Sequence, residues 1–356
     1  MKIDDFILHI PDLFIEDETS QSDYIIDRLT SQRLKLFKLI NEFDVSDRVY
    51  LGVRNDTIKS NVKELYDSII KSVQCFLDGH FEKSRNIIYN TFFNRDNPKR
   101  KALPIRRINA FEIFYRIRES QTYNLYSKEE MFHIPFEKRG LVSNQRYSIS
   151  GYPCLYLGSS IYNCWEETNR PNIDTCNIVG LRNLRTIDVI DLSIPQMEKM
   201  DFNAESIYNL VLPLVCSLKV KNNANYFKTE YIVTQNILGC IIMRNSISDE
   251  PIELEGIQYT STFYGQKQCM FTDKKLLTNY VFPIKKSKKM GLCDELWASF
   301  EMTKPTSLTQ IRLTEDKTSD NNNFYKLWNR KDERNSYERS ILGFVESKLR
   351  GYFYGI

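Results

Sequence analysis

The sequence predicts an α+β fold, because helical and strand periodicity occupy different parts of the chain. From residue 20 to residue 93, apolar residues recur every three or four positions, as in amphipathic helices. Beyond residue 106, short apolar runs separated by turns replace that pattern. The 356 residues are 42% hydrophobic, which is enough for a sizeable core and one or two domains.

Two or three amphipathic helices are expected in the first part of the chain. Apolar stripes at helical spacing cover residues 24–40 and 62–77, and a third helix is expected over 79–92. Residues 94–107, NRDNPKRKALPIRR, are polar, contain two prolines and carry six basic residues. A nucleic-acid-binding patch is the alternative to a linker there. The stretch lacks interleaved aromatics and the net charge is only +3, so we favour a linker and expect no nucleic-acid partner.

The strand candidates follow this linker. Helices are expected between them at 160–169, 203–217 and 229–238, which together predict a mixed or split sheet. The best strand candidates are residues 110–117, 154–157, 186–191, 231–233, 240–244, 256–260 and 268–272.

The last part of the chain is expected to be an extension. Residues 295–302 suggest a short amphipathic segment, and 303–323 are polar enough for a mobile loop. Residues 324–353 return to helical spacing, and the apolar stripe of that helix needs a partner surface on the N-terminal helices or on another protomer. The sequence therefore predicts a helical region with its linker over 1–105, a catalytic domain over 106–285 and an extension over 286–356.

The cysteines and histidines argue against a metal site. Eight cysteines and three histidines are spread along the chain without a Cys-x-x-Cys pair, so we expect no bound metal and buried free thiols. No stretch reaches the roughly 18 apolar residues of a membrane span. The first 13 residues lack the features of a secretory signal, and a cytoplasmic protein with no membrane partner is expected.

Residues 146–167, RYSISGYPCLYLGSSIYNCWEE, organise the functional argument. Gly151 and Pro153 force a turn, residues 155–157 form a short buried strand, and residues 158–160 end it and supply a cap for the helix that follows. This order of elements brings Arg146, Tyr156 and a carboxylate on the helix towards one cleft.

These residues resemble the RES-domain family, named for shared Arg, Glu and Ser positions. The resemblance rests on IFYRIRE at 113–119 and on the run from Met131 to Glu167, and it covers roughly residues 110–285. The matching positions, in order, are Arg116, Arg146, Tyr156, Glu166 and, in the stretch IQYTS at 257–261, Ser261. The sequence departs from the family at Tyr147, where Trp or Phe is common, and at Thr260, where Pro often precedes the serine.

The resemblance implies a fold like that of the ADP-ribosyltransferase toxins, with split sheets around a dinucleotide cleft. It also implies NAD breakdown at the nicotinamide N-glycosidic bond, by an NAD glycohydrolase or phosphorylase that acts as a toxin or an antiviral defence effector. NAD would be the substrate, so no cofactor is expected. An inhibitory antitoxin or other regulatory partner would keep such an enzyme in check.

Each matching residue type suits that reaction. Glu166 would stabilise the oxocarbenium-like transition state, and Arg146 would bind the pyrophosphate through paired donors. Tyr156 would face the nicotinamide ring or its ribose, and Ser261 would bind a phosphate, the carboxamide or an attacking oxygen. Arg116 matches the arginine of the first strand, with Arg118 as a phosphate-binding neighbour on the same face.

Several alternatives stay open. Glu167 competes with Glu166, and Thr260, Thr262 or Ser246 with Ser261. The structural alternatives are an Arg146 that bridges two loops and a Tyr156 that belongs to the core. The chain could instead transfer ADP-ribose to a protein, or bind NAD or ADP-ribose without turnover.

The flanking segments are expected to regulate the activity. An enzyme that consumes NAD endangers its own cell, so we expect gating by a bound partner or by assembly into a homo-oligomer, most often two-fold. Removing residues 303–356 is then expected to leave a folded catalytic core with altered assembly or regulation.

Overall fold

The computed structural model shows two compact units, each built from several segments of the chain. Unit 1 comprises Met1–Arg106, Ser143–Ser150 and Asp188–Phe271, and unit 2 comprises Arg107–Val142, Gly151–Ile187 and Thr272–Ile356. The division of the chain at residues 105 and 285 stays a prediction. The structure describes residues 3–15, 22–42, 55–94, 96–97, 99, 102–120, 124–195, 203–246, 253–261, 276–314, 337–338 and 340–355.

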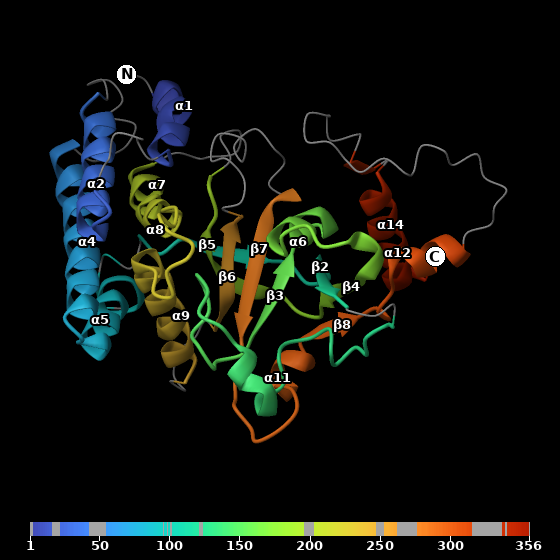
Figure 1. Cartoon of the computed structure of the whole chain (residues 1–356). Helices are drawn as coiled ribbons and strands as arrows, with labels where there is room; N and C mark the ends of the chain where they lie inside the picture. Colours follow the sequence, from blue (N-terminus) through green and yellow to red (C-terminus); the bar gives the residue numbers. More distant parts are fainter. Residues whose placement is uncertain are drawn as a thin grey trace. The chain divides into compact units, whose positions relative to one another are not determined.

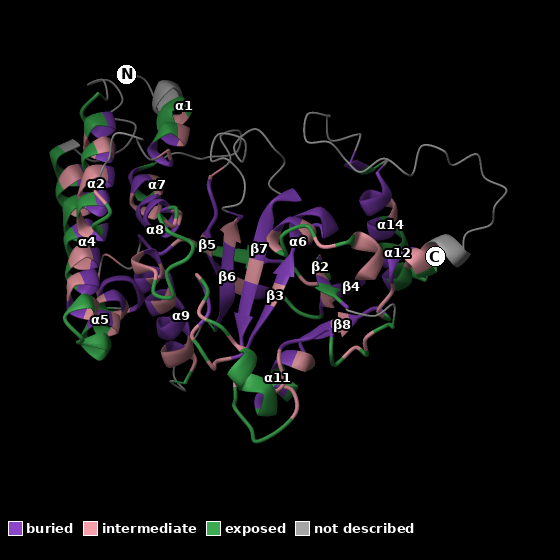
Figure 2. Cartoon of the chain, viewed as in Figure 1, coloured by how far each residue is buried: buried purple, intermediate pink, exposed green. Residues whose placement is uncertain are grey.

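Unit 1 is mostly helical, as its apolar periodicity predicts. Helices α2 and α4 lie side by side (Figure 1), and they bury the stripe that contains Leu29, Leu36 and Ile40 on α2 and Tyr66 and Ile69 on α4. Their outer faces are largely exposed (Figure 2). The helices of unit 1 are α1 (Ile3–Leu13), α2 (Ile25–Asn41), α4 (Asn55–Leu77), α5 (Phe81–Ile88), the π-helical turn η1 (Tyr89–Phe93), α7 (Ala204–Asn209), α8 (Val211–Cys216), the 3-10 turn η6 (Thr229–Tyr231) and α9 (Ile232–Asn245).

Helix α9 overturns two of the strand predictions. Residues 231–233 and 240–244 were expected to be strands, but they lie in η6 and α9. This helix is buried on most sides, so its apolar residues do not follow a clear helical period. The helix expected over 229–238 is confirmed by η6 and the first half of α9. Ser72 of α4, Ser84 of α5 and Asn236 of α9 form a buried hydrogen-bonded cluster that links these three helices.

The strands of unit 1 are β5 (Ile187–Leu192) and β6 (Leu254–Thr260), which pair in parallel. The expected strands at 186–191 and 256–260 are thereby confirmed, and the expected helix at 203–217 is present as α7 followed by α8. Strand β1 (Ile105–Ile108) lies at the boundary of the two units and occupies the end of the predicted linker.

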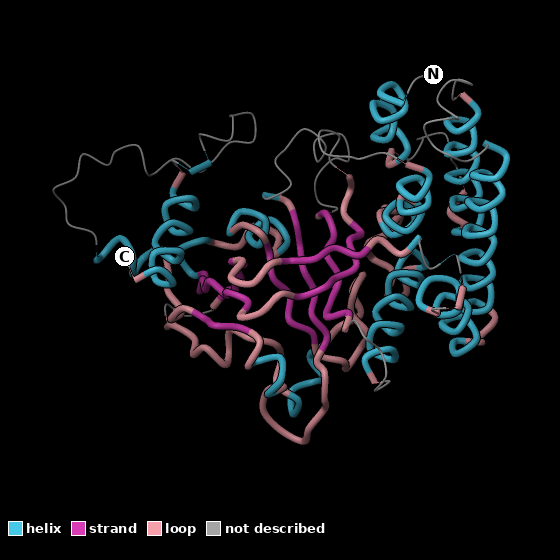
Figure 3. Tube along the Cα trace, turned by 180° about the vertical axis from the view of Figure 1, so that it is seen from behind, coloured by secondary structure: helices cyan, strands magenta, loops and turns pink. Residues whose placement is uncertain are grey.

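Unit 2 contains an antiparallel sheet in the order β7-β3-β2-β4-β8. Its strands are β2 (Ile113–Glu119), β3 (Cys154–Gly158), β4 (Cys176–Asn183), β7 (Thr278–Pro283) and β8 (Phe300–Met302), drawn in magenta in Figure 3. β2 is paired with β4 along its full length, but its registered pairing with β3 is the single pair Tyr115 and Gly158. Strands β2 and β3 are therefore less closely paired than β2 and β4.

Helices cover this sheet within unit 2. Helix α14 packs on β4, where Phe353 and Leu349 lie within 3.5 Å of the position that a side chain on Gly180 would occupy. The other helical elements are the 3-10 turns η3 (Phe136–Leu141) and η4 (Ile173–Thr175), and the helices α6 (Ile161–Glu167), α11 (Asp294–Trp297), α12 (Leu308–Thr314) and α14 (Ile341–Tyr354).

Three expectations for the C-terminal region need correction. The apolar stripe of α14 is buried against β4 and α6 of the same unit, so it needs neither the N-terminal helices nor a second protomer. Residues 308–314 form α12, although the polar composition of 303–323 favoured a loop. β8 is an edge strand paired with β4, so residues 300–302 belong to the sheet. The expected strand at 268–272 and the start of the helix expected over 324–353 lie outside the described residues.

The α+β class is confirmed by these elements. The seven cysteines among the described residues are free and buried, as expected. Burial raises the thiol pKa of Cys154, Cys164 and Cys216 to about 12 in each case, which keeps them protonated. In the described part of the chain, no helix is both long enough and apolar enough to span a membrane.

Candidate functional site

The six predicted site residues are divided between the two units. Unit 2 holds Arg116 and Arg118 on β2, Tyr156 on β3 and Glu166 on α6. Arg146 and Ser261 belong to unit 1. The two sets are described separately.

Helix α6 is fixed at its start by the loop residues that precede it. Ser160 is the N-cap, and its hydroxyl accepts the N–H of Asn163 at 3.0 Å while donating to the carbonyl of Leu276 at 2.8 Å. Gly158 is required by packing, since a β-carbon there would lie 2.5 Å from the Sγ of Cys164. The predicted cap and helix are therefore present, with Glu166 in the last turn.

The carboxylate of Glu166 is buried and paired. Arg170 donates to it from Nε at 3.0 Å and from a terminal nitrogen at 2.8 Å, and the guanidinium lies 5.6 Å from the ring centre of Trp165. Asn169 and Arg170 both have left-handed backbone angles, with φ of 62° and 52°, which is unfavourable for residues other than glycine. This turn after α6 places the guanidinium of Arg170, whose side chain is mostly exposed, against the buried carboxylate of Glu166.

The neighbouring Glu167 is held in a different way. Its carboxylate accepts a hydrogen bond from Nδ2 of Asn279 at 2.7 Å, and Oδ1 of Asn279 accepts from Nδ2 of Asn163 at 2.6 Å. Both asparagines are buried, whereas the side chain of Arg170 is 57% exposed. A ligand could therefore replace the partner of Glu166 by moving one exposed side chain, which is harder to do for Glu167.

Arg116 is a half-buried cation without an acidic partner among the described residues. Its guanidinium donates to the carbonyl of Tyr156 at 2.7 Å, its Nε is buried with no hydrogen-bond partner, and it forms no ion pair with the described residues. Burial lowers its pKa to about 10, and the thiol of Cys164 on α6 is close enough to oppose that shift. A half-buried cation with a buried Nε and no ion pair among the described residues is a candidate for binding an anionic ligand.

Two further groups surround Arg116. Arg118 donates to the carbonyl of Glu130 at 2.7 Å, with its guanidinium 4.7 Å from the ring centre of Tyr126. His133 is buried, and its Nε2 accepts the N–H of Cys293 at 2.9 Å, so the proton is on Nδ1, which donates to the carbonyl of Ile134 at 2.8 Å. Burial lowers the pKa of His133, and Arg116 acts in the same direction.

In unit 1, Arg146 uses both outer nitrogens of its guanidinium at the end of α8. They donate to the carbonyls of Cys216 at 2.7 Å and Leu218 at 2.9 Å, and the guanidinium lies 5.2 Å from the ring centre of Tyr231. This arrangement corresponds to the loop-bridging alternative for Arg146. Its role as a pyrophosphate clamp stays a prediction and would require these bonds to be exchanged.

Ser261 is buried directly after β6. Its competitors have other contacts: the hydroxyl of Thr260 accepts the N–H of Ile194 at 3.0 Å, and the hydroxyl of Ser246 donates to the carbonyl of Met243 at 2.6 Å. Thr262 lies outside the described residues. The choice of Ser261 stays a prediction.

The sequence reasoning missed Arg170, although a signal was present. Glu166 and Arg170 have the i, i+4 spacing that pairs a glutamate with a following basic residue on a helix. It also missed Glu346, a carboxylate within the apolar stripe of α14, whose pKa is raised to about 7 by burial. Among the described residues, no three histidine, cysteine, aspartate or glutamate side chains cluster as metal ligands would.

Comparison with known proteins gives one informative relative. No family model matches the sequence, and no solved structure matches it. A protein of Bacillus subtilis (strain 168) that is named "Putative toxin YopC" is 30% identical over 285 residues, which cover 72% of this chain. The matched region spans 61% of that relative, so less than two thirds of its length is represented here.

Proposed function

We propose that the protein is a toxin that degrades NAD, as an NAD glycohydrolase or phosphorylase of the RES type with an ADP-ribosyltransferase-like fold. The toxin role is supported by the similarity to the Bacillus subtilis relative and by that relative's name. The NAD chemistry is supported by the resemblance to the RES family and by the side chains of unit 2. An inhibitory antitoxin is the partner that such a toxin requires.

The observation that carries the proposal is Arg116. Partial desolvation of a guanidinium that has no carboxylate partner among the described residues is unfavourable to the folded protein, and an anionic ligand would provide the missing charge. A pyrophosphate matches the two-pronged donor geometry of arginine. Arg118 follows two residues later on β2, which supplies a second cation for the same group.

Glu166 would supply the electrostatic part of the reaction. The bond between C1 of the ribose and the nicotinamide nitrogen breaks, the bonding electrons leave with nicotinamide, and the sugar becomes oxocarbenium-like. A carboxylate nearby stabilises this positive charge and accepts a bond from a ribose hydroxyl. Water or phosphate then adds at C1, and water loses a proton to solvent. For Glu166 to act in this way, the ribose must take the place that Arg170 occupies.

The test is the release of nicotinamide from NAD by the purified protein, with Glu166→Gln as the main variant. Gln keeps the shape and removes the charge, so turnover should fall about a hundredfold or more while circular dichroism and the melting temperature show a folded protein. Glu167→Gln is the matched control on the adjacent position, and it should lose less than about tenfold. Equal loss in Glu167→Gln with an active Glu166→Gln would identify Glu167 as the catalytic carboxylate.

The products distinguish the related activities. Free ADP-ribose indicates water as the acceptor, and ADP-ribose 1-phosphate formed only with added phosphate indicates a phosphorylase. Labelled ADP-ribose that stays on protein would show a mono-ADP-ribosyltransferase instead. NAD that binds and is recovered intact would show a non-catalytic binding module and would overturn the enzymatic proposal.

A further inference from the structure

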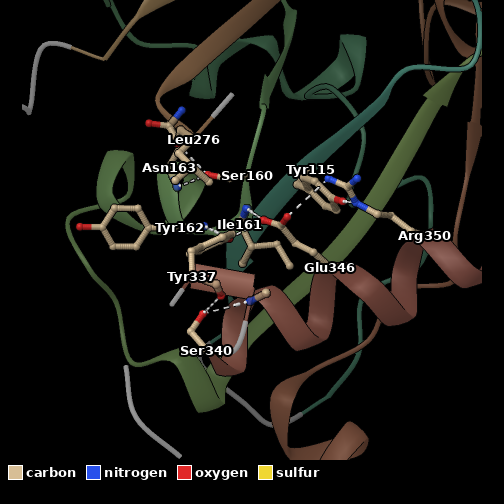
Figure 4. Close-up of polar contacts among 11 residues, drawn as sticks. Tyr115, Ser160, Ile161, Tyr162, Asn163, Leu276, Tyr337, Ser340, Glu346 and Arg350 are labelled. Carbon is tan, nitrogen blue, oxygen red and sulfur yellow. Dashed lines mark hydrogen bonds and ion pairs between the residues drawn. The ribbon is translucent and has the colours of Figure 1, made fainter. Parts of the chain in front are cut away.

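A buried polar network joins the C-terminal helix to the start of α6 (Figure 4). Oε1 of Glu346 accepts the backbone N–H of Ile161, the first residue of α6, at 2.7 Å, and it also accepts the hydroxyl proton of Tyr337. The same hydroxyl accepts the N–H of Tyr162 at 3.4 Å. All four residues belong to unit 2, and two of them, Tyr337 and Glu346, lie beyond the residues that match the RES family.

The side chains that form this network are buried in the interior of unit 2. Glu346 is 6% exposed and Tyr337 is 3% exposed, so both side chains were removed from water to make these bonds. On its other side Glu346 faces Arg350, whose nearest nitrogen is 3.7 Å from Oε2 and whose Nε donates to the hydroxyl of Tyr115 at 2.8 Å. The charged and titratable groups around Glu346 are therefore Tyr337, Arg350, Tyr115 and Cys164.

The backbone before α14 is shaped to place Tyr337. The hydroxyl of Ser340 accepts the N–H of Gly343 at 3.2 Å and donates to the carbonyl of Tyr337 at 2.6 Å. A β-carbon on Gly343 would lie 2.3 Å from that same carbonyl oxygen, so only glycine fits. The cap of α14 and the position of Tyr337 thus depend on each other.

Helix α6 needs such support, because it has only seven residues. A helix of that length is not stable by itself, and its position is set by tertiary contacts at its ends. Glu166 lies one residue before the end of α6, so a shift of the first turn also shifts the carboxylate. A displacement of about 1 Å at a reacting group can cost a hundredfold in rate.

We propose that Glu346 and Tyr337 are positioning residues, which bind the first turn of α6 and thereby fix Glu166 for catalysis. The catalytic part of this inference rests on the proposed NAD cleavage. Neither residue touches the substrate, so their loss should lower kcat and leave the KM for NAD nearly unchanged.

Two measurements test it on the full chain: hydrogen exchange of the amides in residues 158–168, and kcat and KM for nicotinamide release. Tyr337→Phe and Glu346→Ala should speed exchange in α6 by about tenfold or more and lower kcat by about tenfold to a hundredfold, with KM within about twofold. Glu346→Gln keeps an oxygen acceptor for Ile161 and should restore most of kcat. Glu338→Gln, an exposed glutamate next to Tyr337, is the matched control and should change neither measurement.

The outcomes separate the two proposals. Unchanged exchange in α6 in both Tyr337→Phe and Glu346→Ala would overturn the inference, and Tyr337→Phe alone decides if Glu346→Ala does not fold. Faster exchange with unchanged kcat would show that the network is structural and would overturn the positioning role. If the unmodified protein releases no nicotinamide, the proposed function fails and takes the positioning role with it, while the exchange data still decide whether the network holds α6.

Discussion

At the scale of single residues, the proposed role of Arg116 predicts opposite effects on stability and on NAD binding. Partial desolvation of a guanidinium with no carboxylate partner among the described residues costs free energy, which its bond to the carbonyl of Tyr156 offsets only in part. Arg116→Met keeps most of the aliphatic stem and removes the charge. We expect a free energy of unfolding that is unchanged or about 1 kcal/mol higher, with NAD affinity at least about tenfold weaker.

Denaturant titration and calorimetric binding of NAD check this, with both measured in the Glu166→Gln protein so that the ligand is not consumed. Arg118→Met is the matched control, because Arg118 lies on the same strand but is exposed. Arg118→Met should leave the free energy of unfolding unchanged and should weaken NAD binding less than Arg116→Met does. A large loss of stability in Arg116→Met with normal NAD affinity would show that Arg116 is only structural.

His133 makes a second residue-scale prediction, for the dependence of stability on pH. The folded state holds the ring neutral, since Nε2 accepts the N–H of Cys293 and burial lowers the pKa. Below the ordinary value of 6.5 the unfolded chain binds a proton that the folded chain does not, so stability falls as pH falls. His133→Gln retains a donor and an acceptor without titrating.

The free energy of unfolding of the unmodified protein should therefore decline relative to His133→Gln as the pH is lowered from 7 to 5. Urea titrations at several pH values measure that difference. His80 is exposed and serves as the control. The free energy of unfolding of His80→Gln should change with pH in the same way as that of the unmodified protein. If the free energy of unfolding of His133→Gln also changes with pH as in the unmodified protein, the folded state does not hold the ring neutral.

At the scale of elements, the sequence predicts those whose local signals and packing agree. The cap before α6, expected within residues 158–160, and strand β2 were readable, because a cap and a short apolar run between turns each leave a distinct pattern. Helix α9 was readable only in part: a helix was expected over 229–238, but residues 240–244 were expected to be a strand, because burial on most sides weakens the periodicity. The pairing of Arg146 with the end of α8 was invisible for another reason, since it joins residues 70 and 72 positions apart.

The contact between β3 and α6 makes an element-scale prediction. Gly158→Ala should lower the free energy of unfolding by about 1–3 kcal/mol, because its new β-carbon meets the Sγ of Cys164. Removing that sulfur in the double variant with Cys164→Ala should recover part of the loss. A double-mutant cycle from denaturant titration gives the coupling. If the changes in free energy of unfolding of the two single variants simply add up in the double variant, the predicted steric contact between Gly158 and Cys164 is absent.

At the scale of the whole molecule, the C-terminal segment belongs to the fold of unit 2. The expectation that a core without residues 303–356 would stay folded stays a prediction, and the contacts of α14 with β4 and of Glu346 with α6 favour the opposite outcome. We expect a chain that stops at residue 336 to lose the cooperative unfolding transition of unit 2 and to expose its apolar surface. Differential scanning calorimetry and binding of a hydrophobic dye measure both. A truncated chain with an unchanged transition would restore the earlier expectation of a separable extension.

Assembly into a homo-oligomer stays a prediction that light scattering can test.

The bond between Ile161 and Glu346 joins residues 185 positions apart, and this separation delays the completion of α6 during protein synthesis. At translation rates of about 5–20 residues per second, the ribosome needs roughly ten to forty seconds to pass from one residue to the other. For that interval the nascent chain already contains the glutamate of α6 but not the group that binds the first turn of the helix. We expect a nascent chain stalled before residue 337 to be inactive, and nicotinamide release from stalled and released chains would measure this. On the proposed function, the chain would stay inactive towards NAD for that interval, which leaves time for an inhibitory partner to bind it first.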